Sequence, residues 1–225
     1  MLSFIHGFKV LVALSVASFG FLGWSSVAAA QTSVNPVDRM IESLVSTQTL
    51  TADFVQTTRA KSTAVRTSSG SFWLAKPGLL RWEVMKPYPQ TQVLNTKEFW
   101  IYDPDLSQAS VRPVAAANLT GLAGLLLSTN TLTREELSER YSFSEQPARD
   151  RLQWVKVVPV KPEPALSQLL VGIDVDGLLS RFEITDGLGQ VTSISLTRVM
   201  KNISIDASRF QFTPPAGVSV LRAAR

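Results

Sequence analysis

The sequence predicts a mainly β protein with helices (α+β), in which a strongly curved antiparallel sheet carries most of the chain. Three observations lead to this class. Short runs with the composition of strands follow one another from residue 50 onward. No helical segment separates the runs of the first half, so the crossovers that parallel strands need are missing there. Several neighbouring runs are apolar on both faces, which a curved sheet with a pocket on its inner face explains.

The chain begins with the pattern of a secretory signal peptide, residues 1–30. His6 and Lys9 precede an uncharged stretch over 10–24, and alanines at 28–30 form a small-residue cleavage site. We expect cleavage just after this site, at the start of a single domain over 31–225. The alternative is an uncleaved membrane anchor, because no charged residue follows the stretch for some distance, but the cleavage site argues against it.

The composition of the mature chain excludes several classes of function. His6 is the only histidine and there is no cysteine. Zinc sites of Cys and His, cysteine nucleophiles, Ser-His-Asp triads and disulfides are therefore all excluded. The stretch Asp174-Val175-Asp176-Gly177 resembles the start of a calcium loop but lacks the later ligands, so a hairpin turn is favoured. We predict a protein that is not an enzyme and that uses neither a cofactor nor a metal.

The first element of the mature chain is a predicted amphipathic helix. Asn35 is suited to the N-cap and Pro36 to the first helical position. Apolar residues then recur at helical spacing: Val37, Met40, Ile41, Leu44 and Val45. We expect this helix to pack on the convex side of the sheet, which leaves the concave side to form a pocket.

Strands are predicted in two groups. The first group is Thr51–Thr58, Val65–Leu74, Leu79–Met85, Thr91–Leu94 and Glu98–Tyr102, and the second is Leu152–Val160, Leu169–Val175, Leu178–Thr185 and Gln190–Met200. Asp103-Pro104-Asp105, Asp176-Gly177 and Asp186-Gly187 are predicted turns.

Between the two groups of strands, two short helices are predicted. Residues 119–127 are apolar on every side of a helix, and Thr133 with Glu136 fits a capping box at the start of the second helix. Residues 119–127 are either a plug for the pocket or an ordinary core helix.

Two further patterns allow two interpretations each. The apolar excess comes from neighbouring strands: Phe72, Trp73, Leu74, Leu79, Leu80, Trp82, Val84, Met85, Phe99, Trp100, Ile101 and Tyr102. It indicates either core packing or the wall of a pocket. A basic run without acids consists of Arg59, Lys61, Arg66, Lys76 and Arg81. It indicates either a surface for an acidic partner or lipid head groups, or a solvated strand surface. Export removes nucleic acid from the possible partners.

Four stretches together resemble the LolA family of periplasmic outer-membrane lipoprotein carriers. They are "LTADFVQT" (50–57), "GSFWLAKPGLLRWEVMKPYPQ" (70–90), "FWIYDPDLSQ" (99–108) and "FQFTPPAGVSV" (210–220), and the likeness extends over 35–221. The resemblance implies an incomplete, strongly curved antiparallel β-barrel covered by a short-helix lid, in a periplasmic monomer. It also implies that a hydrophobic cavity receives the acyl chains of lipoproteins from the inner-membrane LolCDE transporter and that the outer-membrane receptor LolB takes them over.

The resemblance also suggests where the cavity and its latch lie. We expect the lipid cavity to be lined by Leu80, Trp82, Phe99 and Ile101 from the sheet and by Leu122, Leu125 and Leu126 from the lid. Many relatives have an Arg-Pro pair whose arginine is held to latch the lid shut, and this chain has Lys76-Pro77 there. Because lysine offers a compact charge in place of a planar fork of donors, we expect a looser latch.

Three other functions are alternatives to this one. The receptor LolB shares the fold but needs a cysteine for acylation, which this chain lacks. A lipid- or lipopeptide-sensing regulator on a similar half-barrel stays open, although the length of a single domain argues against it. An esterase is disfavoured because the mature chain has no histidine.

Overall fold

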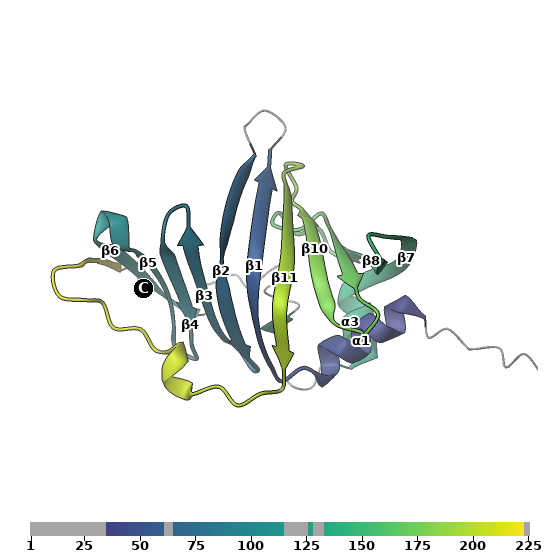
Figure 1. Cartoon of the computed structure of the whole chain (residues 1–225), viewed down its shortest axis with the longest axis horizontal. Coiled ribbons are helices and arrows are strands. Elements are labelled where there is room, and N and C mark those ends of the chain that lie inside the picture. The colour runs from purple at the N-terminus through teal and green to yellow at the C-terminus, as the bar shows by residue number, and fades with distance from the viewer. Residues whose placement is uncertain (1–34, 61–64, 115–125, 128–132, 223–225) are drawn as a thin grey trace, which may run out of the picture. The chain divides into compact units, whose positions relative to one another are not determined.

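The computed structural model describes residues 35–60, 65–114, 126–127 and 133–222. In this part of the chain the strands are β1 Thr49–Arg59, β2 Arg66–Ala75, β3 Leu79–Lys86, β4 Gln90–Leu94, β5 Glu98–Asp103, β6 Gln108–Pro113, β7 Tyr141–Arg149, β8 Leu152–Pro159, β9 Gln168–Ile173, β10 Leu179–Thr185, β11 Val191–Lys201 and β12 Ser219–Arg222. They form one open, curled sheet in the order β12-β6-β5-β4-β3-β2-β1-β11-β10-β9-β8-β7 (Figure 1). The predicted fold class is confirmed.

The sheet consists of two antiparallel meanders joined by the first strand. β1 to β6 pair in sequence, β7 to β11 pair in sequence, and β1 pairs with β11 across the junction. The exception to antiparallel pairing is β12, which lies parallel to β6. The predicted strands do not include β6, β7 or β12, although the predicted turn at Asp103-Pro104-Asp105 leads into β6, which pairs with β5 as in a hairpin. β7 and β12 are edge strands, and β7 is polar and contains Pro147, which only an edge strand or a bulge tolerates.

The helices begin as predicted. In α1 (Pro36–Ser46) the Asn35 side chain accepts a hydrogen bond from the Val37 amide at 2.8 Å. In α3 (Arg134–Arg140) both hydrogen bonds of the Thr133–Glu136 capping box are present. Of the predicted helix over 119–127, the described residues 126 and 127 are helical and the rest lie outside the described residues. None of the described helices has the length and apolar character needed to span a membrane.

The side of the sheet on which α1 packs corrects the prediction. Met40, Ile41 and Leu44 of α1 are buried in the same core cluster as Phe54 and Phe72 of the sheet. Phe54 and Phe72 belong to the face that also lines the main cavity, so α1 packs on the concave face and not on the convex one. The physical reason is that a curled sheet brings the side chains of distant strands together on its inner face, where a helix buries more apolar surface.

The convex face near β5 is covered by the segment that follows β11. Phe212 in this segment lies 5.5 Å from the Trp100 ring and 5.4 Å from the Tyr102 ring, measured between centroids. The Arg209 guanidinium lies 4.5 Å from the centroid of Trp73. The segment then returns to the sheet as β12 beside β6 (Figure 1). One apolar face of β5 is therefore buried by the chain's own C-terminal segment.

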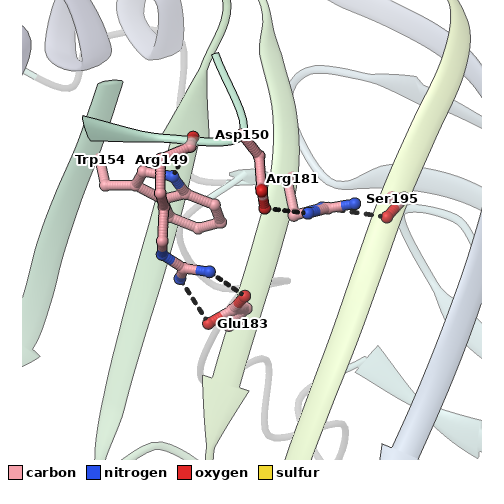
Figure 2. A network of polar contacts seen from close by, with 6 residues as sticks. All are labelled: Arg149, Asp150, Trp154, Arg181, Glu183 and Ser195. Carbon is pink, nitrogen blue, oxygen red and sulfur yellow. Dashed lines mark hydrogen bonds and ion pairs between the residues drawn. The ribbon is translucent and has the colours of Figure 1, made fainter. Parts of the chain in front are cut away.

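The convex face over β8, β10 and β11 carries a polar network (Figure 2). Arg149 donates two hydrogen bonds to Glu183, at 3.1 and 2.8 Å, and its guanidinium lies 3.9 Å from the centroid of Trp154. Arg181 donates to Asp150 at 2.8 Å and to Ser195 at 3.2 Å. Trp154 is only 1% exposed beneath this network. Charged side chains cover this part of the sheet.

Candidate functional site, an apolar cavity on the concave face

The concave face encloses a cavity of about 360 Å³ that is lined mainly by apolar side chains. Its lining residues are Gln56, Phe72, Leu74, Leu80, Trp82, Gln92, Leu126, Leu127, Ala165, Phe182, Ile184, Ile194 and Leu196. β3 and β10 both contribute, although β2, β1 and β11 lie between them in the sheet. A flat sheet would place β3 and β10 about 19 Å apart, so the curl of the sheet creates this cavity.

Stacked aromatic rings form one wall of the cavity. The Trp82 ring lies 3.9 Å from Phe54 and 5.3 Å from Phe72, measured between centroids, with interplanar angles of 25° and 19°. Phe54 and Phe72 are almost fully buried, while Trp82 keeps part of its surface free. The stack holds Trp82 in place and presents a rigid apolar surface to the cavity.

The C-terminal end of α1 is fixed beside this cavity by side-chain hydrogen bonds. Lys76 Nζ donates to the Leu44 carbonyl at 2.6 Å, and Asn202 Nδ2 donates to the Ser46 carbonyl at 3.0 Å. Thr47 Oγ1 donates to the Ser43 carbonyl at 2.6 Å. Carbonyl groups of a last helical turn lack partners within the helix, so these bonds satisfy them. Burial lowers the pKa of the Lys76 ammonium below its ordinary value.

The structure separates the residues predicted to line the lipid cavity into three groups. Leu80, Trp82 and Leu126 line the main cavity. Phe99 and Ile101 lie on the same face but line a second cavity of about 270 Å³ at the sheet edge, which we call the edge cavity. Its other lining residues are Ser110, Val111, Arg112, Leu221 and Arg222. Leu122 and Leu125 lie outside the described residues.

The cavity wall includes further residues that were not predicted to line it. Phe182 and Ile184 on β10 and Ile194 and Leu196 on β11 line the cavity but were not predicted to do so. The available signal was apolar side chains two residues apart on one strand face, the same signal that marked Leu80 and Trp82. Ala165, from the proline-rich loop between β8 and β9, gave no such signal.

The arrangement suits binding of an apolar ligand. Among the residues that the structure describes, no three acidic, histidine or cysteine side chains lie together in a way that could hold a metal. Asp174 forms a turn, as predicted: its Oδ1 accepts hydrogen bonds from the Asp176 and Leu178 amides at 3.0 and 2.9 Å. The two glutamines in the wall are the polar contribution of the sheet to the cavity.

Comparison with known proteins decides the family. The family described as outer membrane lipoprotein carrier protein LolA matches residues 45–213. The chain belongs to the LolA family. It is 33% identical to the outer-membrane lipoprotein carrier protein of Methylococcus capsulatus over 214 residues, which cover 95% of this chain and 97% of the relative. It is 34% identical to the outer-membrane lipoprotein carrier protein of Bordetella pertussis, over 88% of this chain and 92% of that one.

A solved structure shares the fold of this LolA-family chain. An uncharacterized conserved protein from Thermus thermophilus superposes with a TM-score of 0.51 at 16% identity, over 84% of this chain and 97% of that one. At this identity the likeness concerns the fold alone. Membership of the LolA family places the chain among binding and transport proteins and not among enzymes.

Proposed function

We propose that this protein binds the acyl chains of lipoproteins in its concave cavity and carries them through the periplasm. In this proposal it receives its cargo from the inner-membrane LolCDE transporter and delivers it to the outer-membrane receptor LolB, as a monomer released from its signal peptide at Gln31. The supporting observation is the cavity itself, which the curled sheet encloses with apolar side chains from both halves of the sheet. Its volume lies in the usual range of small-molecule sites.

A lid is a necessary part of this proposal, because a carrier must also release its cargo. A triacylated anchor has about 40 methylenes, and burying them at ~0.8 kcal/mol each would approach ~30 kcal/mol. Non-covalent affinity saturates at roughly 18–21 kcal/mol. A lid that competes with the acyl chains for the cavity lowers the net affinity and so permits release. We assign this role to residues 119–127, with Leu122, Leu125 and Leu126 entering the cavity when it is empty.

Lys76 is the proposed latch of the closed state. Among described residues it donates a hydrogen bond to the Leu44 carbonyl of α1. The latch would therefore hold α1 against the end of β2, which Lys76 directly follows. α1 and Leu126 share a small cavity with Leu74, which links the position of α1 to that of the lid. Acyl chains that enter the main cavity would compete with this packing.

The proposal is tested by placing a charge in the cavity. Leu80→Glu puts a carboxylate into an apolar wall and should abolish binding of both a hydrophobic fluorescent probe and a purified lipoprotein. Val55→Glu is the matched control, because Val55 is 48% exposed and lies on the opposite face of the sheet, on β1. A folded Leu80→Glu protein that binds probe and lipoprotein as the parent does would overturn the proposal.

The proposed location has its own test. N-terminal sequencing of protein released from the periplasm should give a chain that starts at or near Gln31. Recovery of an intact chain in the membrane fraction would contradict it.

A further inference from the structure

The concave face changes in polarity along its strands. Moving along β1 from the cavity, Phe54 is followed on the same face by Gln56 and then Thr58. On β11, the neighbours of these positions change in the same direction, from Leu196 through Ile194 to Thr192. The apolar cavity therefore continues into a polar region at the end of β1 where the β1–β2 hairpin turns.

This polar region is itself hollow. A space of about 860 Å³, which we call the vestibule, is lined by Gln56, Thr58, Arg66, Thr67, Ser68, Val84, Pro87, Tyr88, Gln90 and Gln190. Gln56 also lines the main cavity, so the two spaces adjoin. Most of the vestibule lining consists of neutral amides and hydroxyls, which donate and accept hydrogen bonds without a charge.

We propose that the vestibule binds the first residues of the cargo polypeptide, next to the acylated residue. The inference rests on the proposed carrier function and names a second part of the same site. A lipoprotein anchor is apolar in its acyl chains and polar in the peptide that follows, and the cavity and vestibule present the same order. Peptide N–H and C=O groups are the same in every sequence, so neutral amides and hydroxyls bind them with little regard to the cargo's side chains. A vestibule of this kind suits a broad range of cargo.

Arg66 adds one preference to this neutral lining. It pairs in register with Thr58 on the concave face, and it is the charged member of the vestibule lining. Its side chain forms no ion pair or hydrogen bond with another described residue. No acidic side chain lines the vestibule among the described residues, and its lining residue Gln90 donates from Nε2 to Asp103 at 2.7 Å. The Arg66 guanidinium is thus available to an acidic side chain near the start of the cargo.

The experiment compares three ligands that share one diacylglyceryl-cysteine amide. The first has no peptide, the second continues with serine and three glutamates, and the third continues with serine and three lysines. Binding is measured to the mature parent protein, Arg66→Glu and Arg59→Glu. Arg59 follows Thr58 on β1 and therefore points to the opposite face, so its variant carries the same charge change outside the vestibule.

The parent should bind the acidic lipopeptide about fivefold more tightly than the basic one, the upper range for an exposed ion pair. Arg66→Glu should remove or reverse this preference, and Arg59→Glu should keep it. Gln190→Ala, which changes the vestibule alone, should weaken both lipopeptides by about fivefold, the value of one hydrogen bond. It should leave the ligand without peptide unchanged. Binding of the same proteins to vesicles with and without an anionic phospholipid is measured as well. The parent and Arg66→Glu should not differ in this binding.

Three results would overturn the inference. If all four proteins bind the three ligands alike, the vestibule is no peptide site, although the carrier function stands. If Arg66→Glu loses only binding to the anionic vesicles, Arg66 binds lipid phosphate and not cargo. If the parent binds none of the three ligands, the carrier function fails and the inference fails with it.

Discussion

The two faces of the sheet are built from the same alternating strands but are completed differently. On the convex face Trp100 is 6% exposed, because Phe212 of the C-terminal segment covers it. On the concave face, the stacked Trp82 is held from one side by Phe54 and Phe72 and borders the cavity with the other. Both residues are tryptophans in the same meander, one on β5 and one on β3.

This difference separates stability from binding. Where the protein's own chain covers a face, the apolar surface of that face is buried in every folded molecule and stabilises the fold. Where a face stays hollow, its apolar surface is buried only when a ligand binds, so the burial stabilises the complex instead. Where the C-terminal segment covers it, the convex face should therefore contribute mainly to folding. The part of the concave face that lines the cavity should contribute mainly to binding, and the following predictions test that division.

The largest effect is expected from Trp100→Ala. Removing a buried tryptophan should lower the free energy of unfolding by about 3–5 kcal/mol, because it leaves a hole beneath Phe212. Probe binding to the protein that remains folded should not change. Denaturant unfolding and probe titration measure the two quantities. Trp82→Ala is the matched control and should show the reverse: a smaller loss of stability and a large loss of binding. If a folded Trp100→Ala protein lost probe binding, the assignment of stability to the convex face and binding to the concave face would be wrong.

Lys76→Leu should produce the next effect. Removing the bond to the Leu44 carbonyl should cost the closed state about 1.5–3 kcal/mol, the range for a charged donor. The balance then moves toward the open state, so loading persists or tightens while release to the receptor slows. Lys76→Arg should favour the closed form instead. Transfer of a bound lipoprotein to the receptor is the measurement, with the exposed Lys97→Leu as control. Equal transfer by all these proteins would show that no latch exists at this position.

Arg149→Lys should have a smaller effect, confined to stability. Lysine keeps the charge but loses the paired hydrogen bonds to Glu183 that Figure 2 shows. Because both side chains are partly exposed, the loss should stay under about 1 kcal/mol. Thermal unfolding measures it. Altered lipoprotein binding would mean that the convex network acts on the cavity.

The smallest effect concerns pH. Burial lowers the pKa of Lys76 in the folded state from its ordinary 10.5. Between the lowered value and 10.5 the unfolded chain binds more protons than the folded one, so this lysine makes stability rise with pH across that window. Lys76→Met should lack the rise. The difference in free energy of unfolding between parent and variant, followed from neutral to alkaline pH, should therefore shift in favour of the parent. A difference that stays constant with pH would contradict the assignment.

The sequence by itself determined the features that depend on a few neighbouring residues. Asn35 and Pro36 begin α1, Thr133 and Glu136 cap α3, and Asp174 closes the turn between β9 and β10. Each of these follows from a side chain that bonds the backbone two to four residues away. Alternation also predicted most strands, because successive side chains point to opposite faces.

Only the tertiary structure decided which face curls inward and what covers each face. The alternation of side chains along a strand shows that Phe99 and Trp100 point to opposite faces of the sheet. It does not show which of the two faces becomes concave. That choice depends on β1 pairing with β11, which brings Ile194 and Phe182 opposite Leu80. The same long-range closure placed α1 inside the curl. Such contacts join residues far apart in the chain, and no local pattern specifies them, because their free energy is gained only when the whole sheet has closed.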